Sequence, residues 1–429
     1  MKRLTHRTSC RVCGHTPLER IIKFDPIALP MKFEATREAA QAAPRYPISL
    51  NICSDCGHVQ QTEIVDDETL WVGYTYQSSH APVMPRHFQE TAAKIIERFR
   101  PAPGSLIIDI GSNDGSFLRP FKDAGYRVLG IEMVKEIAAQ AQRDGIETIG
   151  EPLSPNIAAE IRAKYGPAAI ITAFNVLAHS DDLHSMVRAI QSMIDAKGVF
   201  VYEVQYLRDV IDRTLVATVF HEHLSHHTVK SMRRLLSQYY MDVFDVDLVP
   251  IQHGSMIGYA QFQSGPHQVS TFLGYLQDYE KIMQYDKPEG LRKFARNVYE
   301  LRTRCEALVS LWRSSGATVA GYGAAMSGPG LISMLGLTGA IGYIVDDHPQ
   351  KVGLFSPGDG LEVLPTSELL KRQPDYCVIL AWVHAQRIID QNAEYLARGG
   401  NFVVLCPDFR VVSAQEYSEA ERLSVMENA

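Results

Sequence analysis

Residues 105–117 read Ser-Leu-Ile-Ile-Asp-Ile-Gly-Ser-Asn-Asp-Gly-Ser-Phe, a stretch that combines an aliphatic run with a glycine-rich turn. The run at 106–110 is almost continuously apolar, which is typical of a buried parallel strand. In the turn, Gly111 and Gly115 allow the backbone to approach a ligand, and Asp109 supplies an acceptor beside them. The stretch therefore predicts a strand–turn–helix unit of a doubly wound α/β sheet that binds a nucleotide-like ligand.

The spacing within this turn distinguishes between kinds of nucleotide. Its form is D-x-G-x-x-x-G, whereas dinucleotide-binding folds carry G-x-G-x-x-G. The form resembles motif I of class I S-adenosylmethionine (SAM) methyltransferases. The next expected strand, 127–132, ends on an acid that can accept both hydroxyls of an adenosine ribose. The expected SAM contacts are Asp109, Gly111, Asn113, Gly115, Glu132 and Asn175.

Further strands extend the predicted sheet. Apolar runs at 169–174 and 198–204 alternate with helical patterns, so these strands should be parallel with right-handed crossovers. Residues 241–249 and 255–262 are expected to form an antiparallel closing pair. Because ligands bind outside the carboxyl ends of such strands, residues 175–179 should face the cofactor.

Four of the seven cysteines form two C-x-x-C-G-H motifs, at 10–15 and 53–58. The spacing lets two thiolates of one tight turn reach the same ion, so the motifs predict one zinc held by Cys10, Cys13, Cys53 and Cys56. Four thiolates leave no open position, which makes the zinc structural rather than catalytic. The stretch between the motifs is longer than in a compact ribbon and contains strand-like pieces at 18–24 and 46–52, which predicts a β-rich module.

Two alternatives stay open for these motifs: His15 and His58 as substitute ligands, or two unrelated turns with incidental cysteines. The other cysteines, Cys305, Cys377 and Cys406, lie in apolar surroundings and are expected in the core.

Residues 218–227 contain four histidines, at positions 221, 223, 226 and 227. The metalloprotease pattern H-E-x-x-H is not met, because Ser225 stands where the second histidine belongs. A second metal site and a polar helix start with solvated histidines are possible interpretations. An acid–base function is favoured, because histidine is best suited to proton transfer near neutral pH and Glu222 can orient a neighbouring imidazole.

The C-terminal third predicts a second, smaller α/β unit. A core-facing helix is indicated by apolar residues spaced three and four apart: Leu291, Phe294, Val298, Leu301, Cys305 and Leu308. Residues 319–325 form another strand-to-glycine turn, and strands are expected at 341–345, 378–380 and 402–405. Backbone N–H groups of such a turn can hold a phosphate.

Four features occur together in order: the paired C-x-x-C motifs, Tyr-Thr-Tyr-Gln-Ser-Ser at 74–79, Asp-Ile-Gly-Ser-Asn-Asp-Gly at 109–115, and His-Glu-His at 221–223. Together they resemble the nucleotide-sugar C-methyltransferases, over nearly the whole length. The resemblance implies an α/β protein with a zinc-binding β-rich module (1–75), a class I SAM methyltransferase domain of Rossmann-like fold (76–265), and a helical linker with a Rossmann-like substrate domain (266–429).

The resemblance also implies catalytic roles. His223 would be the base that removes a proton next to the substrate ketone, with Glu222 as the acid beside it. His179 and Tyr76 would stabilise the enolate oxygen, and His221 is the next candidate in the loop. Expected substrate contacts are Tyr74, Ser78, Phe220, Tyr322 and Gly323.

Three positions depart from the family pattern. Phe220 stands where the family often has tyrosine, Ser327 where it has lysine, and Val383 where it has asparagine. These changes keep open a SAM-dependent enzyme that acts on a non-sugar keto compound. An NAD-dependent sugar-nucleotide oxidoreductase or epimerase is the further alternative, although the D-x-G-x-x-x-G form argues against it. A third alternative is a zinc-ribbon adaptor protein without enzymatic activity.

The amino-acid composition limits the kinds of partner that the protein is expected to bind. The net charge is −7, from 42 Lys+Arg against 49 Asp+Glu, with no long basic block, so no nucleic-acid partner is expected. No apolar run approaches the ~18 residues of a membrane span, and no apolar stretch follows the charged N-terminus, so a cytoplasmic protein is expected. The low, odd number of cysteines argues against a disulfide framework. The expected partner is a small molecule, and oligomeric state is not predicted.

Overall fold

The computed structural model describes residues 4–71, 76–80 and 83–418. Contacts divide the chain into two units. Unit 1 comprises Met1–Glu19, Asn51–Arg208 and Glu222–Gly290, and unit 2 comprises Arg20–Leu50, Asp209–His221 and Leu291–Ala429. Because the chain passes between the units more than once, each is assembled from separate segments. The three domain ranges expected from the sequence stay a prediction.

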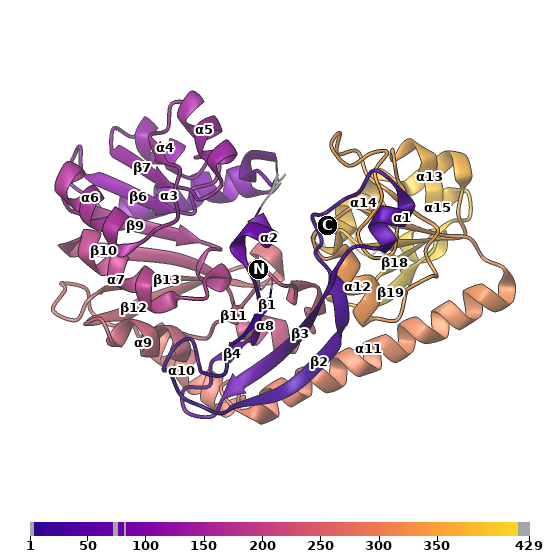
Figure 1. Cartoon of the computed structure of the whole chain (residues 1–429), viewed down its shortest axis with the longest axis horizontal. Helices are drawn as coiled ribbons and strands as arrows, with labels where there is room; N and C mark the ends of the chain where they lie inside the picture. The colour runs from indigo at the N-terminus through magenta and orange to yellow at the C-terminus, as the bar shows by residue number, and fades with distance from the viewer. Residues whose placement is uncertain (1–3, 72–75, 81–82, 419–429) are drawn as a thin grey trace. The chain divides into compact units, whose positions relative to one another are not determined.

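Unit 1 contains a seven-stranded sheet (Figure 1). In chain order its strands are β6 (Leu106–Ile110), β7 (Arg127–Ile131), β8 (Thr148–Ile149), β9 (Ala168–Phe174), β10 (Ile194–Gln205), β12 (Met241–Val249) and β13 (Ser255–Phe262). The spatial order is β12-β13-β10-β9-β6-β7-β8. The five strands from β10 to β8 are parallel, whereas β13 runs antiparallel to both β10 and β12.

This topology confirms the predicted parallel sheet and its antiparallel closing pair. The sequence order of the strands reverses between β6 and β9, which are direct neighbours in the sheet. In open α/β sheets, such a switch point is where ligands bind, outside the carboxyl ends of the strands. The glycine-rich turn after β6 and residues 175–179 after β9 therefore lie at the same edge of the sheet.

Helices cover both faces of the sheet. Side chains along β6 alternate between the faces: Ile108 belongs to one buried cluster and Ile107 to the other. The first cluster includes residues of α6 (Pro155–Tyr165), α7 (Leu183–Met193), α9 (Val229–Ser237) and α10 (Thr271–Ile282). The second includes residues of α3 (Met84–Phe99), α4 (Leu118–Asp123) and α5 (Lys135–Arg143). Each fully buried aliphatic side chain stabilises this three-layer arrangement by roughly 1.5–3 kcal/mol.

The N-terminal region is rich in β-structure, as the sequence predicts. Its strands are β1 (Leu4–His6), β2 (Leu18–Ala28), β3 (Arg45–Cys53), β4 (Val59–Gln60) and β5 (Glu63–Val65), followed by the short helix α2 (Asp67–Trp71). β1 pairs with β5, and a four-stranded sheet has the order β11-β4-β3-β2, where β11 (Ser225–His226) comes from the histidine-rich loop. Cys10, Cys53 and Cys56 belong to the same buried cluster as Ile108, so the cysteine turns pack onto the core of unit 1.

Unit 2 contains a six-stranded sheet of order β16-β15-β14-β17-β18-β19. Its strands are β14 (Val319–Tyr322), β15 (Tyr343–Val345), β16 (Val363–Leu364), β17 (Tyr376–Ile379), β18 (Asn401–Val404) and β19 (Arg410–Val412). All are parallel except β19. The order reverses between β14 and β17, which makes a second switch point and confirms the predicted second α/β unit.

The helices of this unit are α1 (Arg37–Gln41), α12 (Gly328–Met334), α13 (Ser367–Arg372), α14 (Ala385–Gln391) and α15 (Ala393–Ala397). Two helices, α8 (Leu207–Asp212) and α11 (Pro288–Ser315), begin in unit 1 and end in unit 2. The predicted apolar stripe of α11 is buried at Leu291, Phe294, Val298, Leu301 and Cys305. Leu308 is only half-buried, and Val309 and Trp312 continue the buried stripe instead.

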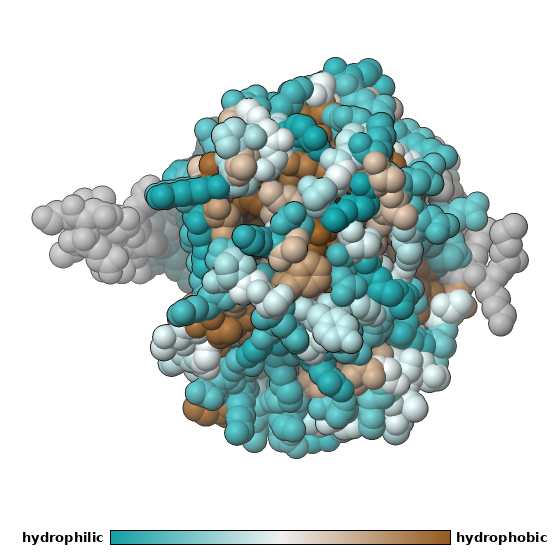
Figure 2. Space-filling model, turned by 90° about the vertical axis from the view of Figure 1, so that its left-hand side faces the viewer, coloured by the Kyte–Doolittle hydropathy of each residue, from teal (hydrophilic) through white to brown (hydrophobic). Residues whose placement is uncertain are grey.

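The face drawn in Figure 2 is mostly hydrophilic, with hydrophobic side chains in small separate groups. Among the residues that the structure describes, no helix combines the length and the apolar character needed to cross a membrane.

Candidate active site and metal centre

The two C-x-x-C motifs fold into matched turns. In the first, Gly14 N donates a hydrogen bond to Cys10 O at 3.0 Å, and in the second, Gly57 N donates to Cys53 O at 2.9 Å. Both glycines have positive φ, +74° and +75°, a conformation that side chains with a Cβ rarely adopt. The glycine after each pair therefore closes the turn and directs its two thiols inward.

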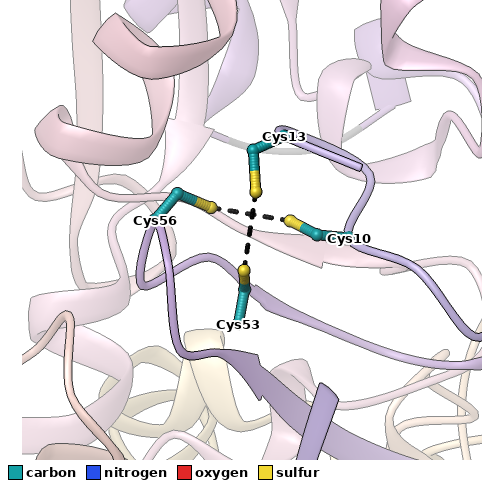
Figure 3. A group of neighbouring side chains, drawn as sticks. All are labelled: Cys10, Cys13, Cys53 and Cys56. Carbon is teal, nitrogen blue, oxygen red and sulfur yellow. Dashed lines mark hydrogen bonds between the residues drawn. The ribbon is translucent and has the colours of Figure 1, made fainter. Parts of the chain in front are cut away.

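The four thiols converge, as Figure 3 shows. Cys10 Sγ lies 3.5 Å from Cys56 Sγ, Cys13 Sγ lies 3.6 Å from Cys53 Sγ, and all four sulfurs lie within 4.8 Å of one another. A tetrahedral zinc with Zn–S distances of about 2.3 Å puts its sulfurs about 3.8 Å apart. The cysteines therefore fit a structural zinc with no open position.

The histidines that follow the turns have other partners. His15 Nε2 lies 3.1 Å from Ser54 Oγ, and His58 Nε2 lies 3.2 Å from Ser225 Oγ. Burial raises the pKa of the Cys13 thiol to about 12, so a bound cation would favour the thiolate form of this ligand. Among the described residues, the four cysteines are the one group with metal-ligand geometry, and the histidine-rich loop does not form a second.

The glycine-rich turn after β6 leaves room only for backbone. Gly111 has φ +67°, and a Cβ there would lie 2.4 Å from Val176 Cγ2. Gly115 has φ +78°, and its Cβ would lie 2.9 Å from Ile146 Cγ1. Asn113 between them also has positive φ, +48°. The turn therefore forms a tight backbone cradle of the kind that a nucleotide-like cofactor requires.

Glu132 lies directly beside this cradle. Its Oε2 accepts from Asn113 N at 3.0 Å and its Oε1 from Val134 N at 2.8 Å. Burial raises the pKa of this carboxyl, while the two N–H groups oppose the rise. A carboxylate offers about four acceptor sites, so further ones stay available for ribose hydroxyls.

Asp109, the acid of the D-x-G-x-x-x-G pattern, lies inside the sheet. It is buried and accepts a hydrogen bond from Thr172 Oγ1 of β9 at 2.6 Å. Burial raises the pKa of Asp109 to about 7, which Thr172 partly opposes and the nearby charge of Glu132 reinforces. Its observed contact therefore joins the two strands of the switch point, and its predicted contact with the cofactor stays a prediction.

A segment before α3 is attached to the same turn. Ser78 N donates to Asn113 Oδ1 at 2.9 Å, and Ser79 N donates to Asp114 Oδ2 at 2.9 Å. The Tyr76 carbonyl accepts from Asn113 Nδ2 at 3.1 Å, and the Tyr76 side chain is 36% exposed. These contacts bring predicted substrate residues to the cofactor turn. Tyr74 lies outside the described residues.

His179 and His223 meet in unit 1. Their ring centroids lie 5.1 Å apart with the rings at 73°, an edge-to-face arrangement. The ring of Trp71 also lies edge-on to His179, with the ring centroids 5.7 Å apart. Burial, and then the proximity of His223, lowers the pKa of His179 to about 3, so this imidazole is neutral at physiological pH.

The other loop histidines are enclosed. His221, His226 and His227 are each at most 2% exposed, whereas His223 is half-buried. The interpretation as a polar helix start with solvated histidines is therefore wrong. Helix α9 begins only at Val229, where Thr228 and Ser231 form a capping box.

The remaining predicted loop residues divide between the units. Glu222 is buried and belongs to unit 1, as does the half-buried His223. Phe220 and His221 belong to unit 2, where His221 Nε2 lies 3.2 Å from the Tyr46 carbonyl oxygen. The roles of these three side chains stay predictions.

Sequence reasoning missed one polar group at the switch point. Glu203 lies near the carboxyl end of β10 and is fully buried, with Oε2 2.5 Å from His87 Nε2 and Oε1 2.9 Å from Asn175 Nδ2. The Glu203 carbonyl also accepts from Asn175 N at 2.8 Å, which holds Asn175 at φ +57°. The acid at the end of the apolar run 198–204 was a visible signal, whereas nothing in the sequence pointed to His87.

In unit 2, Tyr322 and Gly323 lie at the second switch point, at the end of β14. Gly323 has φ +94°, and a Cβ there would lie 2.4 Å from Ala381 Cβ. The next N–H, of Ala324, donates to Asp346 Oδ2 at 2.7 Å. The Nζ of Lys351 donates to the Ala324 carbonyl at 2.8 Å, which brings a cation to this turn from elsewhere in the chain.

Comparisons with known proteins agree with this architecture. Three family models match successive segments: "Putative zinc binding domain" at 10–71, "Methyltransferase domain" at 84–243 and "C-methyltransferase C-terminal domain" at 250–407. The C-methyltransferase NovU of Streptomyces niveus is 28% identical over 407 residues, which cover 95% of this chain and 97% of NovU.

Solved structures with similarity include magnesium protoporphyrin IX methyltransferase (ChlM) from Synechocystis with bound SAH. It is 15% identical, with a TM-score of 0.32, and the match covers 42% of this chain and 83% of that chain. A SAM-dependent methyltransferase from Clostridium acetobutylicum is 8% identical, with a TM-score of 0.34, over 44% of this chain and 95% of that chain.

The fold, the four-cysteine site and the matched domains define a SAM-dependent methyltransferase with a zinc-binding domain. The C-methyltransferase C-terminal domain and the similarity to NovU over 95% of the chain further define it as a SAM-dependent C-methyltransferase.

Proposed function

We propose that this enzyme transfers the methyl group of SAM to the carbon next to the ketone of a nucleotide-linked keto-deoxy-sugar. The observation that carries the proposal is the pair of imidazoles, His179 and His223, 5.1 Å apart in the unit that contains the cofactor turn. Transfer to carbon requires a carbanion equivalent, and a ketone acidifies the neighbouring C–H enough for a histidine to remove its proton. The family resemblance of the sequence supports the sugar substrate.

In the proposed reaction, His223 takes the proton from the carbon next to the ketone, and the C–H electron pair moves into an enolate. His179 and Tyr76 stabilise the developing charge on the enolate oxygen by hydrogen bonds. SAM, when bound, supplies an electrophilic methyl group. The enolate carbon forms the new C–C bond in line with the departing sulfur, which requires the reacting atoms to be held ~3–3.5 Å apart.

Exposure supports His223 as the base among the four loop histidines. A base must reach the substrate, and His223 is half-buried, whereas His221, His226 and His227 are enclosed. The lowered pKa of His179 supports a neutral hydrogen-bonding role for that imidazole. Glu222, buried next to His223 in the chain, is proposed as the acid of the pair.

The second glycine turn is proposed to hold the nucleotide of the substrate, with Tyr322 and Gly323 in contact with it. The Gly323 and Ala324 N–H groups already donate to Val345 O and Asp346 Oδ2, so the support for this proposal is Lys351, which adds a positive charge beside Ala324. A cation at the turn favours the anionic oxygens of a phosphate. Phe220 and Ser78 are proposed as further substrate contacts.

The test is a substrate panel. Purified enzyme is incubated with SAM and a panel of nucleotide-linked keto-deoxy-sugars and non-sugar keto compounds. The mass of each product is measured by mass spectrometry. The expected result is a mass gain of one methylene on at least one sugar nucleotide. A gain seen only with non-sugar keto compounds would overturn the substrate assignment.

The base is tested by His223→Ala, with His6→Ala, an exposed histidine of β1, as the control. His223→Ala should keep SAM affinity but lose methyl transfer by roughly 10²–10⁴-fold, together with exchange of the acidic substrate C–H in deuterated water. Retained exchange in this variant would assign the proton abstraction to another residue. His6→Ala should behave as the wild type.

A further inference from the structure

One arginine inside the zinc turn has an unusual environment. Arg11 lies between the ligands Cys10 and Cys13, and its side chain is 0% exposed. Its backbone N–H donates to Gln60 Oε1 at 2.7 Å, which fixes the turn against β4. Burying a guanidinium is costly unless its donors are hydrogen-bonded, so the partners of Arg11 show what its burial achieves.

Those partners are the two segments that carry the proposed catalytic imidazoles. Arg11 Nε donates to Asp181 Oδ1 at 2.9 Å, two residues beyond His179. Arg11 Nη1 donates to the Leu224 carbonyl at 3.1 Å, directly after His223. One guanidinium therefore contacts both histidine segments, although they lie far apart in the sequence.

A second layer of hydrogen bonds strengthens the same connection. Arg11 Nη1 also donates to the Gln61 carbonyl at 2.5 Å. Gln61 in turn donates through its N–H to the Leu224 carbonyl at 2.9 Å and through Nε2 to the His223 carbonyl at 2.8 Å. The backbone at and directly after the base is thus held by two side chains, Arg11 from the zinc turn and Gln61 from the residue after β4.

We propose that Arg11 is a positioning residue that transmits the geometry of the zinc turn to the His179–His223 pair. This inference rests on the proposed function, because it concerns the base assigned there. Arg11 does not touch the reacting atoms. It bonds the Asp181 carboxylate, two residues after His179, and the Leu224 carbonyl, directly after His223. Its loss should therefore disturb proton abstraction more than cofactor binding.

The test compares Arg11→Gln, which removes the charge, with Arg11→Lys, which keeps it. The matched control is Arg7→Gln, because Arg7 also bonds Asp181 Oδ1, at 3.1 Å, but has no bond to Leu224 or Gln61 among the described contacts. For each variant we measure the zinc content, the SAM affinity by calorimetry, and kcat and KM with a nucleotide-linked keto-deoxy-sugar that the substrate panel shows to be methylated. Hydrogen–deuterium exchange of residues 222–227 is followed without substrate.

Arg11→Gln is expected to retain one zinc and a SAM affinity within about twofold of the wild type, while kcat falls roughly 10- to 100-fold, the scale of a misplacement of about 1 Å. Amide exchange in 222–227 should rise. Arg11→Lys should have a kcat between those of Arg11→Gln and the wild type, and Arg7→Gln should have a kcat close to that of the wild type. An unchanged kcat in folded Arg11→Gln, or an equal loss in Arg7→Gln, would overturn the proposal.

If Arg11→Gln does not fold, Gln61→Met serves as the test of positioning instead. This variant removes the hydrogen bond from Gln61 Nε2 to the His223 carbonyl, and no buried charge is gained or lost. A wild-type kcat in Gln61→Met would then overturn the inference. Different results would refute the proposed base and the proposed positioning role. Full substrate exchange in His223→Ala would refute the base itself, whereas an inactive His223→Ala beside a fully active Arg11→Gln would refute only the positioning role.

Discussion

At the scale of single residues, Glu132 illustrates how one carboxylate serves the cofactor turn. Both of its oxygens already accept backbone N–H groups, at Asn113 and Val134. These contacts order the turn before any cofactor binds and align the remaining acceptor sites. The contribution of the carboxylate to binding should therefore exceed that of an ordinary surface acid.

We predict that Glu132→Ala weakens SAM binding by roughly 1.5–3 kcal/mol, because a charge-assisted acceptor is lost. Calorimetric titration with SAM measures the change. Glu136→Ala, an exposed acid of the neighbouring helix α5, is the control and should bind normally. Equal affinities in the two variants would show that the ribose acceptor is another residue.

A second residue-scale prediction concerns pH. Burial, and then the charges of His223 and His227, lowers the pKa of His226 to about 3, whereas an unfolded histidine titrates near 6.5. The unfolded chain therefore binds more protons between these values, so the contribution of His226 to stability is complete above pH 6.5 and decreases as the pH falls. The stability difference between the wild type and His226→Gln should shrink by about 2 kcal/mol between pH 7.5 and 5.

Urea denaturation at a series of pH values provides the measurement, and Asp109→Asn supplies a contrast of opposite sign. Burial raises the pKa of Asp109 to about 7, so the folded state holds a proton that the unfolded chain releases near pH 4. The stability difference between the wild type and Asp109→Asn should therefore shrink as the pH rises from 5 to 7.5. Parallel slopes for the two variants would contradict at least one of the two assignments.

At the scale of elements, the turn after β6 depends on close approach as well as on backbone conformation. Gly111 and Gly104 both have positive φ, +67° and +74°, so alanine is strained at either position. Only at Gly111 would the new Cβ meet a neighbour, 2.4 Å from Val176 Cγ2, whereas nothing lies within 4 Å at Gly104. A comparison of alanine at Gly104 and at Gly111 therefore distinguishes the cost of backbone strain from the cost of a steric clash.

Gly104→Ala should cost about 1–2 kcal/mol of unfolding free energy, the cost of the left-handed conformation alone. Gly111→Ala should cost clearly more and should also lower SAM affinity, because Val176 must move beside the cradle. Chemical denaturation and calorimetry of both variants provide the measurements. Equal losses of stability would mean that the cradle tolerates a side chain.

At the scale of the whole molecule, the zinc turns do not form a separate core. Cys10, Cys53 and Cys56 belong to the buried cluster that includes Ile108 of the central sheet. Structural zinc contributes its binding energy to folding, and a bound ligand stabilises the folded state to which it binds. Zinc and SAM should therefore stabilise the same cooperative unit.

We predict that SAM raises, and chelation of zinc lowers, the midpoint of one shared calorimetric transition. Cys53→Ser should reproduce the effect of the chelator, whereas Cys305→Ser, a buried thiol of α11, should leave the zinc content unchanged. If chelation abolished one transition while SAM shifted a different one, the zinc turns would be an independently folding module.

Local sequence patterns were sufficient to predict many of the strands, the cofactor and the metal site of this protein. The apolar run 106–110 and its glycine turn predicted β6, its parallel sheet and the cofactor, because strand periodicity and turn chemistry act within a few residues. The cysteine spacing predicted the metal site for the same reason. The enclosed histidines were not predicted, since the same polar loop is compatible with solvent exposure until its packing partners are known.

Contacts between distant segments were decided only by the tertiary structure. The Arg11–Leu224 hydrogen bond joins residues 213 apart, Gln61–His223 residues 162 apart, and His87–Glu203 residues 116 apart. Such pairs leave no periodic trace in the sequence, because they form only after strands and turns have been brought together by burial of their apolar faces. By itself, the sequence therefore determined which elements form and which cofactor and metal they suit, whereas the tertiary structure determined that Arg11 of the zinc turn is hydrogen-bonded to Leu224, the residue after the proposed base.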